Sequence, residues 1–260
     1  MKRRAHIPGR GYTRTASLLA ALVDEPHGTT ASVLARRLDI PKSTLSLILQ
    51  HFLELGIVER ALDDAGFVVG PELIKLAFRI VSNLQMPRVA RPHLEWLARE
   101  IGEDVYFGVQ RGLKAIYIDK VDGTESVRLN VELGSARPLH STAIGKLILA
   151  FSPPSLLDTL LRVGGLPAIT QDTITDPARF RLEVAGIRKR GFSISDGENI
   201  EGIYALAAPV IVRRRIIAGV CIATLRSRGL RHRARWVRKM LRAAGRISRE
   251  IPAPPQPHPV

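Results

Sequence analysis

The sequence predicts an α+β protein of two domains, in which a small and mostly helical N-terminal domain precedes a larger domain with a curved antiparallel sheet. Up to Leu55, apolar side chains recur at the spacing of amphipathic helices, whereas from residue 88 onward such stretches alternate with segments rich in β-branched and aromatic residues. The 260 residues suffice for two domains, and the apolar content of 45% suffices for two cores.

The first domain is expected to contain three helices. An apolar stripe predicts the first over residues 13–23, and the second follows over 30–37, with the Thr30 side chain as its N-terminal cap. The third covers 42–55 and ends at Gly56. Two short helices, a tight turn and a third helix are typical of a helix-turn-helix.

The third helix has the side-chain pattern of a DNA-recognition helix. Its outer face is polar and mostly short-chained, which suits the major groove, and its first residues can meet phosphate through hydroxyl and backbone N–H groups. The inner face carries Leu45, Ile48, Leu49 and Phe52, and the outer face carries Ser43, Ser46, Leu47, Gln50 and Glu54.

A β-hairpin is expected next, because alternating segments over 57–60 and 67–69 flank a turn signal over 63–66. Arg60 on this wing is interpreted either as a phosphate or minor-groove contact or as a solvated edge charge. A protein-interaction module without DNA is the alternative for the whole domain. The DNA contacts predicted for both elements are Lys42, Ser43, Thr44, Ser46, Leu47, Gln50, His51 and Arg60.

A linker helix is expected from Pro71 to about Gln85, within a linker and dimerisation segment over 71–87 that separates the DNA-binding domain (1–70) from the second domain (88–251). Its apolar face is too broad for a free linker, so we expect it to pack against another copy of the chain. The remaining residues, 252–260, are Pro-rich and are expected to be disordered.

In the second domain, helices and strands are expected to alternate. The predicted helices cover 92–101, 142–151, 177–190 and 231–249, and the predicted strands cover 104–110, 115–120, 127–131, 203–212 and 216–225, the last two forming an antiparallel pair across the turn 213–215.

Several of these segments resemble the IclR (isocitrate lyase regulator) family of bacterial transcription factors. The stretch 34–45 is similar to the family's second helix, turn and start of the recognition helix, and 55–60 with 67–73 to its wing and exit. The stretch 134–146 (GSARPLHSTAIGK) is similar to the family's signature loop and helix. One departure is Leu47, where such proteins often have Arg, so the protein lacks one expected DNA contact and could instead touch a thymine methyl.

The resemblance implies a GAF-like effector-binding domain, double-stranded operator DNA as partner, and a homodimer or dimer of dimers. It also implies an effector pocket for small organic acids or aromatic metabolites between the sheet and the signature loop, lined by Leu129, Ala143, Ile144, Ser195, Ile203, Ala205, Cys221 and Ala223.

Such a pocket is largely apolar, and unpaired polar atoms are costly to bury. We therefore expect an effector more apolar than a two-carbon acid, aromatic or aliphatic with one polar end. Backbone N–H groups near 143–145 could still bind an anion. Alternatively, Ile203, Ala205 and Ala223 belong only to the core.

The net charge of +15 favours a polyanionic partner, but ten of the cations lie between Arg226 and Arg249, far from the predicted helix-turn-helix. A protein that coats nucleic acid with this basic segment is therefore an alternative function, and the Arg enrichment of high-GC genomes is an alternative origin of the cluster.

An enzyme is the less favoured alternative, with no catalytic residue, metal site or cofactor assigned. The seven His are scattered, Cys221 lies in an apolar strand as a buried inert thiol, and His140 beside Ser141 lacks an orienting third group. The single Cys, the lack of a secretory signal pattern and the lack of a membrane-length apolar stretch favour a cytoplasmic protein without membrane contact.

Overall fold

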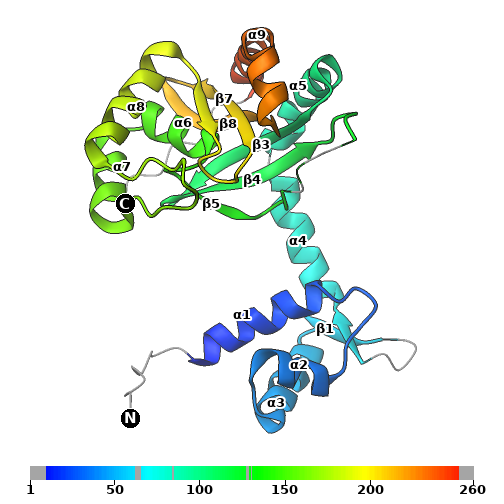
Figure 1. Cartoon of the computed structure of the whole chain (residues 1–260). Coiled ribbons are helices and arrows are strands. Elements are labelled where there is room, and N and C mark those ends of the chain that lie inside the picture. The colour runs from blue at the N-terminus through cyan, green and yellow to red at the C-terminus, as the bar shows by residue number, and fades with distance from the viewer. Residues whose placement is uncertain (1–9, 62–65, 84, 127–128, 130, 252–260) are drawn as a thin grey trace, which may run out of the picture. The chain divides into compact units, whose positions relative to one another are not determined.

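The computed structural model describes residues 10–61, 66–83, 85–126, 129 and 131–251. The chain divides into two compact units, Met1–Leu84 and Gln85–Val260 (Figure 1). The predicted turn residues 63–65 and the Pro-rich tail 252–260 lie outside the described residues.

The first unit is a winged helix-turn-helix, as predicted. Thr30 caps the second helix, since its hydroxyl accepts a hydrogen bond from the Val33 backbone N–H. The two wing strands pair antiparallel, with Val58 opposite Val69. The elements of this unit are α1 (Arg10–Val23), α2 (Ala31–Leu38), α3 (Lys42–Glu54), β1 (Val58–Arg60), β2 (Phe67–Val69) and α4 (Pro71–Asn83).

The second unit is built on a six-stranded antiparallel sheet with the strand order β5-β4-β3-β8-β7-β6. Helices cover both faces of this sheet (Figure 1). Its elements are α5 (Gln85–Ile101), β3 (Asp104–Arg111), β4 (Lys114–Val121), β5 (Ala136–Pro138), α6 (Ala143–Phe151), α7 (Pro154–Thr159), η1 (Leu160–Gly164), α8 (Pro177–Arg190), β6 (Ser193–Asp196), β7 (Ile203–Val212), β8 (Arg215–Leu225) and α9 (Arg226–Glu250).

Side-chain alternation along the strands gives the sheet two apolar faces. One face packs Phe107 and Ile222 against α5 and α9, where Trp236 and Met240 are buried. The opposite face, with Cys221, packs against α6 and α8. The cavity described below lies on this second face.

Two helices of the second unit begin five or more residues before the predicted start. α5 starts at Gln85 rather than at residue 92 and includes Pro92, because Ala90, Leu94 and Leu97 form one buried stripe across the proline. α9 starts at Arg226 rather than at 231. In both helices, tertiary packing outweighs the local breaker signal.

The strand predicted over 127–131 is not formed at the two of its residues that the structure describes. Leu129 and Val131 have no regular secondary structure, and residues 127, 128 and 130 lie outside the described residues. Sequence reasoning missed four short elements, β5, α7, η1 and β6. Strand β6 lacks apolar alternation because its inward residues are the serines Ser193 and Ser195. Both are buried, and their hydroxyl groups donate hydrogen bonds to backbone carbonyl oxygens.

The β7–β8 hairpin forms as predicted, but its turn is shorter than expected. Val212 pairs with Arg215, which leaves Arg213 and Arg214 as the two turn residues. Both have positive φ, 47° and 63°, the conformation that a two-residue hairpin turn requires.

Candidate functional site

The outer face of α3 is open to solvent. Lys42, Ser43, Ser46, Leu47 and Gln50 are all exposed, and Leu47 exposes 58% of its surface. On the inner face, three side chains are buried, Leu45, Leu49 and Phe52, and Ile48 is half-buried. The helix is therefore held to its domain by one side and presents a hydroxyl- and amide-bearing side outward.

The remaining predicted DNA contacts are partly engaged within the domain. Thr44 is half-buried. The exposed His51 hydrogen-bonds through Nδ1 to the Leu47 carbonyl oxygen (2.9 Å), so this ring nitrogen is engaged within α3. The Arg60 guanidinium lies 5.0 Å from the centre of the Phe67 ring, which holds this charge on the wing.

In the second unit, a cavity lies on the α6 side of the sheet, and strand register builds most of its floor. Tyr106 of β3 pairs with Cys221 of β8. One step further along the same face, Ala223 pairs with Ala205 of β7, which pairs with Ser195 of β6. These five side chains line the cavity.

The same floor continues onto the other edge of the sheet. Arg137 of β5 is the register partner of Ala115 in β4. Tyr117 follows two residues later, so it lies diagonally next to Arg137 on the same face. Both side chains line the cavity, Tyr117 buried and Arg137 half-buried.

The start of α6 and the segment after β6 close the cavity, whose volume is about 40 Å³. This is room for one or two water molecules. The other lining residues are Leu129, Val131, Thr142, Ala143, Asn199, Ile200 and Ile203.

The structure brings together seven of the eight residues predicted for the effector pocket. The exception is Ile144, whose side chain points to the sheet backbone at Gly108 and Gly219 and is fully buried there. Sequence reasoning missed the other seven lining residues, which are Tyr106, Tyr117, Val131, Arg137, Thr142, Asn199 and Ile200. Tyr106 and Tyr117 lie in predicted strands, and their face could have been found by alternation. Arg137 could not, because β5 was not predicted.

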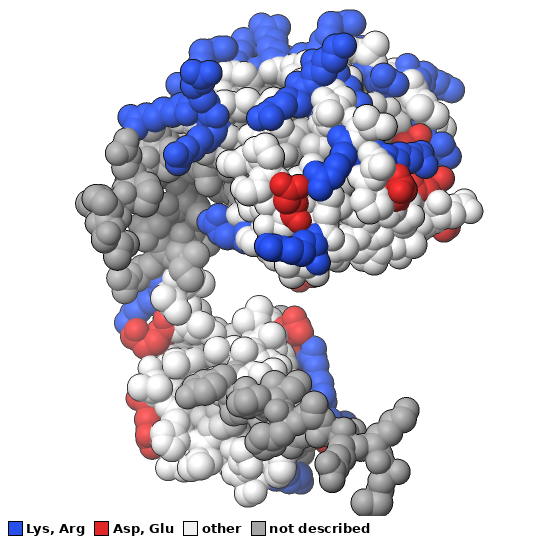
Figure 2. All heavy atoms as spheres, turned by 90° about the vertical axis from the view of Figure 1, so that its left-hand side faces the viewer, with Lys and Arg blue, Asp and Glu red and all other residues white. Residues whose placement is uncertain are grey.

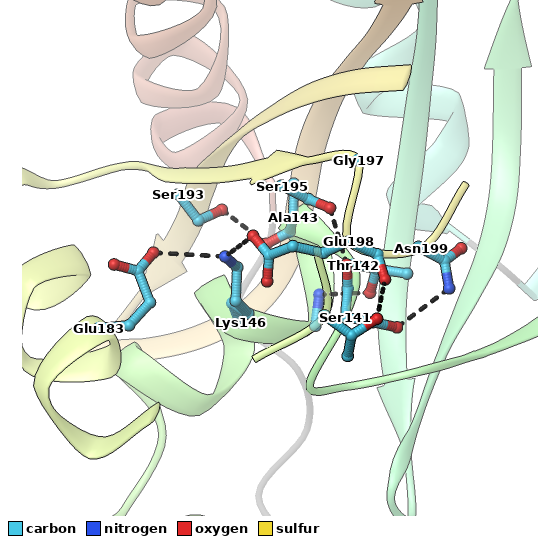
Figure 3. A network of polar contacts seen from close by, with 12 residues as sticks. Ser141, Thr142, Ala143, Lys146, Glu183, Ser193, Ser195, Gly197, Glu198 and Asn199 are labelled. Carbon is cyan, nitrogen blue, oxygen red and sulfur yellow. Dashed lines mark hydrogen bonds and ion pairs between the residues drawn. The ribbon is translucent and has the colours of Figure 1, made fainter. Parts of the chain in front are cut away.

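Most polar groups around the cavity already have partners (Figure 3). Thr142 donates its hydroxyl hydrogen to the Pro138 carbonyl oxygen (2.8 Å), and Ser195 donates to that of Ser141 (2.7 Å). The Tyr106 hydroxyl donates to the Leu129 carbonyl oxygen (2.7 Å). The Asn199 side-chain amide donates to the Ser141 hydroxyl (3.0 Å).

A buried ion pair fixes the segment that closes the cavity. Lys146 of α6, 1% exposed, places Nζ 2.5 Å from Oε1 of Glu198 and 3.3 Å from Oε1 of Glu183 (Figure 3). Glu183 also binds Arg190 at 2.8 Å. Within the described part of the chain, the buried Oε2 of Glu198 has no hydrogen-bond partner. Burial raises the pKa of Glu198 despite the opposing effect of Lys146.

His140 and Cys221, the two groups considered for catalysis, are both buried in the second unit. His140 is buried and hydrogen-bonds through Nε2 to the Pro167 carbonyl oxygen (2.9 Å). Burial also lowers its pKa. Cys221 is buried, and burial raises the pKa of its thiol to about 12, so it stays protonated at neutral pH.

Half of the ten cations of α9 contact other side chains of the second unit. Arg226 binds Asp196 (2.8 Å), Arg228 binds Glu103 (2.7 Å), and Lys239 binds Glu100. Two further arginines, Arg242 and Arg246, lie over the Trp96 ring. Figure 2 shows many Lys and Arg side chains on the second unit. The pairing nevertheless gives half of the ten α9 cations a role in stability, which weakens the nucleic-acid-coating interpretation.

Neither a membrane span nor a metal cluster emerges from the described residues. No helix among them is long and apolar enough to cross a membrane. No group of three or more His, Cys, Asp or Glu side chains among them could hold a metal ion.

Comparison with known proteins supports a regulator with this architecture. The family model described as bacterial transcriptional regulator IclR C-terminal matches residues 78–249, and a MarR family model matches residues 12–66. The chain is similar to the HTH-type transcriptional regulator KipR of Bacillus subtilis, with 30% identity over 76% of this chain and 80% of that protein.

Two solved structures have the same fold. The Thermotoga maritima IclR structure is 29% identical, with a TM-score of 0.78 over 92% of this chain and 97% of that one. An IclR homolog of Microbacterium hydrocarbonoxydans, solved in complex with 4-hydroxybenzoate, has a TM-score of 0.80 over 92% of this chain and 98% of that one, at 23% identity.

Proposed function

Because the chain belongs to the IclR family of bacterial transcriptional regulators, we propose that it binds operator DNA through α3 and the wing and that a small molecule in the second domain changes this affinity. We assign DNA binding to residues 1–70, dimerisation to 71–87 and effector binding to 88–251. The observation that carries the DNA assignment is the two-sided α3, whose apolar side is buried and whose polar side is exposed. Full-length protein should protect a segment of its own upstream region in footprinting, and no protection with or without metabolites would refute the proposal.

The chemistry of the α3 surface divides its residues by role. Lys42, Ser43 and Thr44 stand at the helix start, where positive charge, hydroxyls and free N–H groups suit a phosphate. Gln50 lies about two turns further along and can form a bidentate pair with an adenine edge. Ser46 and Leu47 lie between them, and Leu47 suits contact with a thymine methyl group.

Two substitutions on α3 are expected to separate phosphate binding from base recognition. Lys42→Ala should weaken binding to every DNA sequence and reduce the slope of log K against log salt by about 0.9 for each phosphate that the protein no longer neutralises. Gln50→Ala should instead relax sequence preference by about 1–3 kcal/mol at one base pair. Fluorescence anisotropy with operator and scrambled duplexes at several salt concentrations measures both effects. Equal reductions in affinity for every sequence from both variants would contradict the assignment.

The effector of such a pocket is expected to be mostly apolar, because Leu129, Ala143, Ala205 and Ala223 contribute no polar side chain. The Microbacterium homolog binds 4-hydroxybenzoate, an aromatic acid of this general class. The cavity of about 40 Å³ is smaller than such a molecule, so binding has to displace lining side chains. An effector that binds the opened arrangement better shifts the protein toward it, and operator affinity changes by the difference in binding free energy.

We further propose that α4 is a homodimer contact. Ile74 and Leu76 expose 45% and 51% of their surfaces on this helix. Association of two copies through this helix would remove apolar surface of this kind from water. A two-fold dimer would present two α3 helices to a pseudo-palindromic operator.

Leu76→Asp is expected to weaken the dimer by about tenfold or more, since it places a charge in an apolar contact. Size-exclusion chromatography with light scattering over a dilution series measures this change. The neighbouring Lys75 is exposed and forms an ion pair with Glu72 (2.5 Å) on its own helix, so Lys75→Ala is the matched control and should leave the dimer unchanged. Unchanged association of the Leu76→Asp variant would exclude α4 as the contact.

A further inference from the structure

We propose that the effector is a carboxylate whose negative group binds the Arg137 guanidinium and the Tyr117 hydroxyl, with an apolar body over the rest of the cavity floor. This inference rests on the proposed function, because it treats the cavity as the effector site. It adds the negative charge of the ligand's polar end and the two side chains that bind it.

Arg137 is the only charged side chain that lines the cavity, among the described residues. It is half-buried, and within the described ranges its side chain has neither an ion pair nor a hydrogen bond. Two other half-buried arginines of this domain are paired with acids, Arg190 with Glu183 and Arg228 with Glu103. A guanidinium taken partly out of water without an anion is costly, and a ligand carboxylate supplies the missing partner in bidentate geometry.

Tyr117 provides a second donor beside this cation. Its side chain is 8% exposed, lines the cavity and contacts Tyr106 edge-on, with 5.5 Å between ring centres. In the described structure its hydroxyl has no hydrogen-bond partner. Burial raises the pKa of Tyr117 despite the opposing effect of Arg137, so the hydroxyl stays protonated. A protonated phenol beside an arginine is a donor set for a carboxylate.

The other polar groups around the cavity compete little for the ligand. The hydroxyl hydrogens of Thr142, Ser195 and Tyr106 are all used on backbone carbonyl oxygens. Polar recognition is therefore concentrated at the β4–β5 end of the floor. Toward β8 and β7 the floor is made of Cys221, Ala223 and Ala205, which suit an apolar body.

The lining also argues against a cationic ligand. No Asp or Glu is among the described residues that line the cavity. The nearest acid by sequence register, Asp104, accepts a hydrogen bond from the Gly123 backbone N–H (2.8 Å) and lies 3.5 Å from the Lys120 ammonium. A cation would therefore meet Arg137 without a compensating negative charge.

Matched ligand pairs test the proposal with the full-length protein. Benzoate and benzamide share shape but differ in charge, as do hexanoate and hexanamide. At least one carboxylate should raise the unfolding temperature and bind about tenfold or more tightly than its amide in calorimetry. Arg137→Met should remove this preference, and Arg137→Lys should retain part of it, since a lysine keeps the charge but not the bidentate fork.

The control is Arg235→Met, which removes an exposed arginine on α9, across the sheet from the cavity, and should bind both ligands like the unmodified protein. Unfolding temperatures without ligand show whether each variant is folded. The proposal is overturned if amides bind as well as carboxylates, if Arg137→Met keeps the full preference, or if none of the carboxylates binds below about 10 mM.

DNA footprinting of the same samples keeps this test separate from the proposed function. Arg137→Met without ligand should protect DNA like the unmodified protein, because the substitution lies outside the DNA-binding unit. Carboxylate binding without any DNA protection would refute the regulator proposal and leave the role of Arg137 standing.

Discussion

Replacing Lys146 by Met is expected to lower the free energy of unfolding by about 3–5 kcal/mol, because it leaves the Glu198 carboxylate buried without a partner. Glu198 is 6% exposed, and its Oε2 already lacks a hydrogen bond in the described structure. Glu183 is affected less, since it keeps Arg190 at 2.8 Å. Urea denaturation followed by circular dichroism measures the effect.

Two control variants show whether the effect comes from the orphaned charge. The double variant Lys146→Met with Glu198→Leu removes both charges and should recover most of the stability, since a buried ion pair replaced by apolar side chains is often close to neutral. Lys75→Met breaks the exposed pair with Glu72, whose side chains are 67% and 52% exposed, and should change stability by less than about 1 kcal/mol. A double variant as unstable as the single one would mean that packing, not charge, sets the cost.

The pH dependence of the Lys146→Met variant follows from the raised pKa of Glu198. A buried carboxyl group with a raised pKa is penalised above that pKa, where it is charged, and the penalty disappears as it becomes protonated at lower pH. Without Lys146 the pKa should rise further. The destabilisation should therefore be larger at about pH 8 than at about pH 5, and the reverse order would contradict this account.

The sequence predicted those elements whose local signals agree with their packing. Thr30 and Thr142 occur directly before apolar periodic segments, and both cap a helix in the structure. The long apolar strands β7 and β8 were equally clear, because their ends are set by a polar turn. The helix start predicted at Pro92 was wrong, because buried residues on both sides of the proline keep the helix continuous.

The site was less predictable than the fold, because strand pairing and not composition places its polar groups. Arg137 reaches the cavity only through β5, a three-residue strand with no alternating apolar pattern. Glu198 and Lys146 are 52 residues apart and form a pair that no local pattern indicates. The apolar part of the pocket was predicted better, since Ala205, Cys221 and Ala223 lie on regular strands whose faces follow from alternation.

Gly145→Ala is expected to destabilise the second domain by about 1–3 kcal/mol or more, because the helix start it belongs to packs directly on backbone. A Cβ at this position would lie 2.6 Å from the carbonyl carbon of Leu139, and closer still to the Cα and the carbonyl oxygen of that residue. These atoms cannot move without shifting the signature loop, in which Leu139 follows Arg137 by two residues. The variant should therefore be less stable and also bind carboxylates more weakly, as measured by thermal unfolding and calorimetry.

Gly186→Ala is the matched control, since it makes the same substitution within a helix but in open surroundings. Its Cβ would meet only Nη1 of Arg190, at 3.6 Å, among the described atoms. A glycine inside a helix costs about 0.5–1 kcal/mol relative to alanine, so this variant should be more stable than the unmodified protein by that amount. Opposite signs for the two variants would show that contact with the Leu139 backbone, and not helix propensity, requires the glycine of the GSARPLHSTAIGK stretch. A stabilised Gly145→Ala variant would show instead that the start of α6 can move away from the loop. It would then be wrong that this contact holds Arg137 in a fixed position at the cavity.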